Sequence, residues 1–179
     1  MQVIDGGVNA AKGFMASGAE AGIKYKNRKD MALVYTKSPA VCAGTFTKNV
    51  VKAAPVLWDI DIVRQEEAVH AVVLNSGIAN ACTGGEGRKI NERMAEKTAK
   101  ALGVGTKQVC TASTGVIGMQ MNMDAVEAGI QQLAKGLSDS REAAAAAASA
   151  IMTTDTVCKE AAVTLEISGK KETVGGMAK

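Results

Sequence analysis

The sequence predicts a mixed α/β (α+β) fold, built as a layered sandwich of helices and mixed sheets. Short apolar runs rich in β-branched residues are typical of strands, and amphipathic segments with a helical period follow them. Hairpin patterns at both ends of the chain favour this arrangement over a purely parallel, doubly wound sheet. With 179 residues and no linker rich in Pro, Gly and Ser, the chain is expected to form one domain over residues 1–179.

The first strands are expected in the N-terminal half. Residues 1–24 are rich in Gly and small side chains, so we expect irregular or short-stranded structure there. Residues 31–36 and 40–47 have strand composition and are separated by a Ser-Pro turn signal, which predicts a hairpin. The run at 68–75 has the length and β-branched content of a buried strand.

An amphipathic helix is predicted at 86–102, where apolar residues recur four apart, and Gly103 ends it. A short strand at 108–112 follows, and the stretch after it leads into a second helix at 123–137. A capping box of Asp139 with Glu142 introduces a third helix.

That third helix covers residues 141–152, where six consecutive alanines favour a helix strongly. The chain then ends in two strands within 161–179, joined by a turn at 168–170.

The core must consist of Ala, Val, Ile, Leu and the nine Met, because aromatic residues make up only 3% of the chain. Basic and acidic residues number 21 and 18, a net charge of +3 without a basic stripe, so no nucleic-acid partner is expected. Neither a signal peptide nor an apolar run of membrane-spanning length is recognisable. The expected setting is the reducing cytoplasm, with no membrane partner.

Metal chemistry has no support in the sequence. The single histidine, His70, lies within a predicted buried strand, where a core or edge role is expected. The four cysteines are far apart and form no CxxC motif, so we expect no metal site. Each is expected to act as a small buried hydrophobic residue: Cys42, Cys82, Cys110 and Cys158. Glu66, Glu67 and the lysine pair at 170–171 are expected to be solvated charges.

Two hydroxyl clusters at element junctions are the best candidate sites, TASTGVIG at 111–118 and IMTTDT at 151–156. On chemistry alone, helix capping and tight turns are the favoured interpretation of such residues. No GxSxG or SxxK motif and no convincing base accompany a serine or threonine nucleophile. An oxyanion hole, in which a hydroxyl and a glycine N–H converge on one oxygen, suits Thr114 and Gly115 better. The segment TGGEGRK at 83–89 satisfies neither phosphate-loop motif and is interpreted as a glycine-rich turn.

Several longer motifs resemble those of the ornithine acetyltransferases, also called glutamate N-acetyltransferases, and occur in the same order. They span nearly the whole chain: KGF at 12–14, AGIK at 21–24, SPAVCAGTFTKNVVKAAPV at 38–56, VVLNSGIANACTG at 72–84, ASTGVIG at 112–118, AIMTTDT at 150–156 and GGMAK at 175–179. The resemblance implies a self-cleaving fold shared with related aminopeptidases. In it, this sequence is the α chain and a β chain from the same precursor completes the structure.

The resemblance also implies the chemistry. A threonine at the N-terminus of the β chain takes acetyl from N-acetylornithine and passes it to glutamate, without a metal or organic cofactor. Acetyl-CoA is a further donor in bifunctional members, and an α2β2 assembly is expected. Carried over by motif, Thr114 and Gly115 form the oxyanion hole, while Thr153 and Lys179 bind substrate. A self-cleaving amidohydrolase or aminopeptidase, and a small-molecule-binding module without chemistry, remain alternatives.

Overall fold

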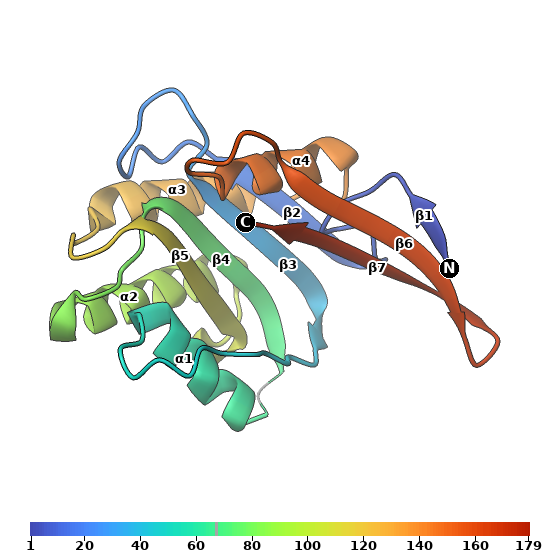
Figure 1. Cartoon of the computed structure of the whole chain (residues 1–179), viewed down its shortest axis with the longest axis horizontal. Helices are drawn as coiled ribbons and strands as arrows, with labels where there is room; N and C mark the ends of the chain where they lie inside the picture. The colour runs from blue at the N-terminus through green and yellow to red at the C-terminus, as the bar shows by residue number, and fades with distance from the viewer. Residues whose placement is uncertain (67) are drawn as a thin grey trace.

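The computed structural model describes residues 1–66 and 68–179, and within them two β-sheets and four α-helices form layers (Figure 1). This confirms the layered mixed α/β fold. The larger sheet has four strands in the order β2-β3-β4-β5, of which only β4 and β5 run parallel. Their bounds are Phe14–Ala19 for β2, Met31–Ala40 for β3, Val69–Ile78 for β4 and Val109–Val116 for β5.

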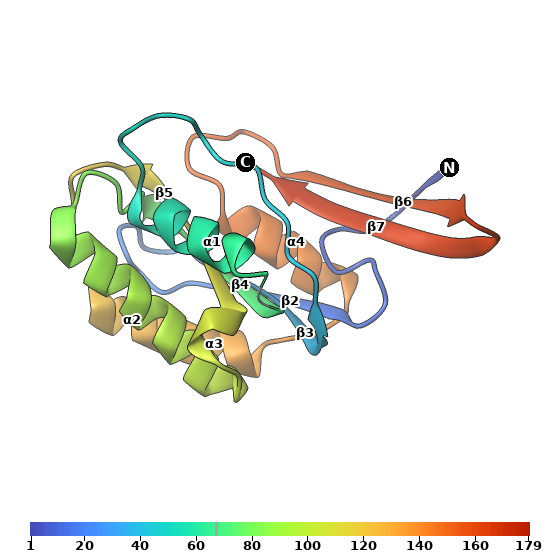
Figure 2. The same cartoon turned by 90° about the horizontal axis from the view of Figure 1, so that it is seen from below.

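Helices cover both faces of this sheet, as the second view shows (Figure 2). Helices α2 (Gly84–Leu102) and α3 (Met123–Lys135) lie on one face, with a short 3-10 turn at Thr106–Gln108 before β5. Helices α1 (Ala54–Arg64) and α4 (Arg141–Ala150) lie on the other. None of the helices within the described residues is long and apolar enough to cross a membrane.

The smaller sheet is antiparallel and has the order β1-β6-β7, with bounds Gln2–Ile4, Lys159–Ile167 and Lys170–Ala178. Its β6–β7 hairpin extends away from the helices and then returns, so the C-terminus lies near the larger sheet and α4 (Figures 1 and 2). Met177, near the end of β7, packs against the residues under α4.

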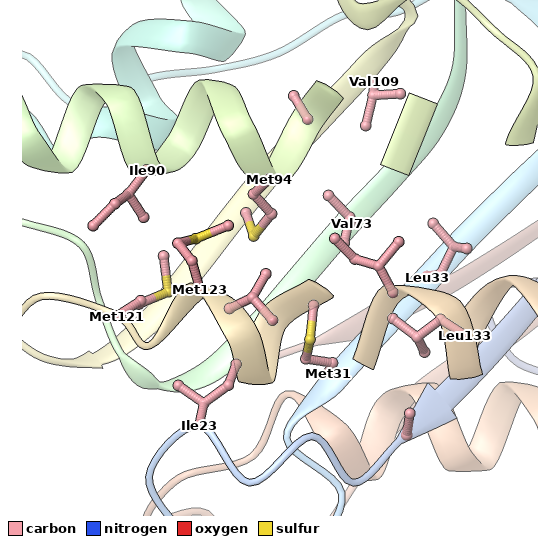
Figure 3. Close-up of a cluster of buried hydrophobic side chains, with 14 of the residues drawn as sticks. Ile23, Met31, Leu33, Val73, Ile90, Met94, Val109, Met121, Met123 and Leu133 are labelled. Atoms are coloured by element: carbon pink, nitrogen blue, oxygen red, sulfur yellow. The ribbon is translucent and has the colours of Figure 1, made fainter. Parts of the chain in front are cut away.

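The two faces of the larger sheet are packed with different side chains. Under α2 and α3 the core is rich in methionine and branched aliphatic residues, among them Met31, Leu33, Val73, Met94 and Val109 (Figure 3). The α4 face is made of alanine, including residues of β2, β3 and α4 itself. A Cβ added at Gly18 in β2 would lie 2.3 Å from the Ala146 carbonyl oxygen, so α4 rests directly on the strand.

The expected hairpin between 31–36 and 40–47 is wrong. Residues 31–40 form one strand whose two edges are occupied by β2 and β4, so no free edge remains for residues 41–47 to pair with. The partner strand is β2, within the N-terminal region expected to be irregular or short-stranded. Residues 41–53 contain no strand and cross the surface to α1.

Smaller expectations also change. The N-cap of α4 is Ser140 and not Asp139, because the Ser140 hydroxyl accepts from the Ala143 N–H at 3.2 Å. Only Cys110 among the cysteines is buried, 3.9 Å from the sulfur of half-buried Cys42; the other two are exposed. Glu66 is exposed as expected, and Glu67 lies outside the described residues.

Candidate active site

A pocket of about 520 Å³ lies where β4, β5, the end of α4 and the C-terminal end of β7 meet. Residues far apart in the chain line it: Leu74, Asn75, Ala112, Ser113, Thr114, Ile151, Met177 and Lys179. Two of the residues that the sequence indicated, Thr114 and Lys179, therefore share one pocket.

Thr114 and Gly115 belong to β5 itself, because the strand runs to Val116 and does not end at residue 112 as expected. β5 is the edge strand of its sheet, and its outer side faces α1. There the Thr111 N–H donates to Asp59 Oδ1 at 3.0 Å. Since alternate N–H groups of a strand point to opposite edges, the N–H of Gly115 is directed to the same outer edge and away from β4.

Only glycine fits at position 115. Its φ is +136°, a region that residues with a side chain rarely adopt. A Cβ there would also lie 2.2 Å from the carbonyl carbon of Gly77, the residue directly opposite in parallel β4. This close approach of two backbones restrains the chain at Gly115, and half-buried Thr114 directly precedes it in the strand.

The other two hydroxyl groups of the stretch, those of Thr111 and Ser113, are buried, although Ser113 itself lines the pocket. Thr111 and Ser113 alternate with Thr114 along β5, so their side chains point to the α2 face, where Val109 is buried. Both hydroxyl groups are buried and have no hydrogen-bond partner within residues 1–66 and 68–179.

A charged cluster forms one end of the site. Lys179 Nζ lies 2.6 Å from Asp155 Oδ2, and the two side chains are 25% and 12% exposed. The same oxygen accepts the Thr153 N–H at 3.1 Å, and Lys159 contacts Oδ1 at 3.1 Å. Hydrogen bonds from Lys179, Thr153 and Lys159 hold the pKa of Asp155 far below its usual range, so this carboxylate is ionised.

Thr153 lies next to the pocket and is joined to Lys179 through Asp155. Asp155 is a functional candidate that only the structure reveals. The sequence offers one indication of its role: Asp155 is the one acidic residue of IMTTDT and stands two residues after Thr153.

Asp59 is a second residue that sequence reasoning missed. It belongs to α1 and holds the edge of β5 through the Thr111 N–H. Burial raises its pKa from 3.8 to about 6, and the bond from Thr111 only partly offsets that effect. No motif marks this aspartate, because its environment is created by the packing of α1 on β5.

His70 does not line this pocket. Its Nδ1 lies 2.9 Å from the Thr36 carbonyl oxygen, and its ring stacks on Tyr35, so His70 has a structural role on an inner strand and lies neither in the buried core nor on an edge strand. In the part of the chain that the structure describes, no three His, Cys, Asp or Glu side chains come together as metal ligands would.

Comparison with known proteins extends these findings. The profile of the ArgJ family matches residues 15–179. An Arginine biosynthesis bifunctional protein ArgJ from Streptomyces coelicolor is 49% identical over 96% of this chain and 43% of its own length. Its counterpart from Symbiobacterium thermophilum is 48% identical over 100% of this chain and 44% of its own length. The chain therefore spans less than half the length of these relatives.

Solved structures agree with the fold. The crystal structure of ornithine acetyltransferase complexed with ornithine from Mycobacterium tuberculosis matches with a TM-score of 0.93 and 41% identity, over 99% of this chain and 93% of that one. The Arginine biosynthesis bifunctional protein ArgJ of Bacillus halodurans matches with a TM-score of 0.94 and 38% identity, over 99% and 92%. Because the family profile and these relatives cover nearly all of its residues, this chain belongs to the ArgJ family.

Proposed function

We propose that this chain is the α chain of an acetyltransferase that moves acetyl from N2-acetyl-L-ornithine to L-glutamate in arginine biosynthesis. The observation that carries the proposal is that Thr114 and Lys179 line one pocket, with the N–H of Gly115 directly after Thr114 in the chain. Family membership and the names of the relatives support it.

In the proposed reaction, a threonine at the N-terminus of a β chain attacks the acetyl carbonyl carbon. Its own α-amino group, with a reference pKa of about 8, takes the hydroxyl proton. The Thr114 hydroxyl and the Gly115 N–H donate hydrogen bonds to the carbonyl oxygen as it becomes an oxyanion. The amide bond then breaks and ornithine leaves with the proton. The amino group of glutamate attacks the acetyl-threonine ester, the ester bond breaks, and the threonine oxygen takes up the proton lost by that amine as N-acetylglutamate is released.

Lys179 is proposed to bind the α-carboxylate that both amino-acid substrates share. An ammonium group has three N–H donors, and Asp155 accepts only one of them. Asp155 also accepts the Thr153 N–H and so holds this segment next to Lys179. Because N-acetylornithine and glutamate both have an α-carboxylate, Lys179 would bind each of them in its half of the reaction.

The proposal includes an α2β2 assembly from one self-cleaving precursor and requires no metal or organic cofactor. Acetyl-CoA is a second acetyl donor in bifunctional members, so the assay below also uses it as a donor. A cytoplasmic location stays a prediction from the sequence.

The test is to co-express this chain with its β chain and assay acetyl transfer from N-acetylornithine to glutamate, and separately from acetyl-CoA. Mass spectrometry of the co-purifying chain should show a threonine N-terminus. Release of free acetate without transfer would instead indicate a hydrolase of similar design. Saturable binding of N-acetylornithine without turnover would indicate a binding module.

A further inference from the structure

Four buried polar side chains lie between α2 and the strands β4 and β5 without full hydrogen bonding. The atoms concerned are Asn75 Oδ1, Asn91 Oδ1 and Nδ2, Thr111 Oγ1 and Ser113 Oγ, none of which has a partner within residues 1–66 and 68–179. Folded proteins leave few such atoms unpaired, because water is lost and nothing replaces its hydrogen bonds.

Strand register brings three of these residues together. Asn75 of β4 is directly opposite Ser113 of β5, and Thr111 is two residues earlier on the same side of β5. This side is the α2 face, since Val73 and Val109 contact the cluster that contains Ile90 and Met94 of α2 (Figure 3).

Asn91 approaches from the helix. It is 1% exposed and lies on the line of α2 that also holds buried Gly87 and Met94, which is the line that faces the sheet. Arg93, on another side of the helix, is turned toward Glu127 of α3. Helix α2 packs against β5, so Asn91 is directed toward the strand that carries Thr111 and Ser113.

The chemistry of the group calls for a ligand that both donates and accepts. The Asn75 Nδ2 group donates to the Ile78 carbonyl oxygen at 2.9 Å, and this fixes Oδ1 as an acceptor that needs a donor. The hydroxyls and the Asn91 amide offer donors and acceptors of their own. A water molecule makes two to four hydrogen bonds of both kinds and is small enough for such a site.

We propose that Asn75, Asn91, Thr111 and Ser113 bind ordered water between α2 and β4–β5, and that this water site positions the backbone of Thr114 and Gly115. The second half of the proposal rests on the proposed function. Ser113 directly precedes Thr114, so a fixed Ser113 side chain restrains the peptide that presents the oxyanion donors. Asn75 and Ser113 also line the pocket, but the polar atoms that would bind the water are buried, so all four act as positioning residues.

A crystal structure of the chain with its β chain, at a resolution that shows ordered solvent, tests the binding site without reference to activity. Water within hydrogen-bond distance of Ser113 Oγ and Asn75 Oδ1 is the expected result. Side chains that have rotated to hydrogen-bond one another directly, with no water among them, would overturn the proposal.

The direction in which Ser113→Ala changes the unfolding midpoint is a second test of the water site. If the hydroxyl binds water, its removal should lower the unfolding midpoint by about 2–4 °C, whereas removal of an unpaired buried hydroxyl leaves the midpoint unchanged or raises it. A higher or unchanged midpoint therefore contradicts the water site.

The positioning role is read from steady-state kinetics of the same complex. Ser113→Ala should lower kcat by about tenfold with KM unchanged, and Ser113→Thr, which keeps the hydroxyl, should restore it. Thr98→Val is the matched control, because it removes a buried α2 hydroxyl that bonds to the Met94 carbonyl and should cost stability alone. An unchanged kcat in Ser113→Ala refutes the positioning role. If the wild-type complex shows no acetyl transfer, the proposed function is refuted, and the water site is then tested by the crystal structure and the unfolding midpoint alone.

Discussion

Replacing Asp59 by asparagine should make the folded chain more stable at pH 8. The wild-type carboxyl has a pKa raised from 3.8 to about 6 by burial, so the folded state binds its proton more tightly than the unfolded state. At about 1.4 kcal/mol per pH unit, this difference corresponds to a penalty of about 3 kcal/mol once the group is ionised in both states. Asparagine keeps an oxygen for the Thr111 N–H and carries no charge.

The sign of the pH dependence follows from the direction of the shift. Well below pH 3.8 the carboxyl is protonated in both states and costs nothing, and the penalty grows as the pH rises from 3.8 to about 6 and is nearly constant above that. We expect the advantage of Asp59→Asn over wild type to be about 3 kcal/mol at pH 8 and to fall to about 1 kcal/mol at pH 4.5.

Urea unfolding followed by circular dichroism at several pH values measures this difference directly. Asp61→Asn is the matched control, since Asp61 lies two residues along the same helix and its side chain is exposed. Its free energy of unfolding should follow that of wild type at every pH. A destabilised Asp59→Asn chain at pH 8, or an advantage that does not change with pH, would refute the burial argument.

Three further predictions concern the pocket. Thr114→Val should lower kcat for acetyl transfer by about 10²–10³-fold with little change in KM, while Thr114→Ser retains most activity; equal loss in both variants would argue against a hydroxyl donor. Gly115→Ala should lower the free energy of unfolding in urea by more than the about 1–3 kcal/mol that an unfavourable φ costs alone, because the added Cβ also clashes with the β4 backbone. Gly118→Ala, at φ +75° in open space, should cost only the conformational part, and similar losses at the two sites would contradict the close approach to β4. Lys179→Met should raise KM for N-acetylornithine and glutamate alike with kcat nearly unchanged; a fall in kcat alone would assign Lys179 to the threonine amine instead.

Local pattern alone determined most of the secondary structure. The four-residue spacing of apolar side chains predicted α2, and the alanine run predicted α4, because amphipathic period and helix propensity act within a few turns. The buried strand at 68–75 was expected from composition and corresponds to β4. Thr114 and Gly115 could be singled out from the motif without knowledge of the fold.

Strand pairing could not be determined in the same way. Residues 31–36 have the same local pattern whether they pair with residues 14–19 or with 40–47, since alternation defines the two faces of a strand and says nothing about which neighbour occupies its edge. For the same reason the extension of β5 to Val116 depended on the parallel register with β4 and was missed.

The sequence by itself predicted the layered α/β class, which the structure confirms, and singled out Thr114 and Gly115 as candidate oxyanion donors, which stays a prediction. Only the tertiary structure decided which groups surround them. Lys179 reaches the pocket because the β6–β7 hairpin returns to the larger sheet, and Asp155 and Asp59 acquire shifted pKa values from contacts with distant segments. Burial and electrostatic energy depend on neighbours in space, and a linear pattern records only neighbours along the chain.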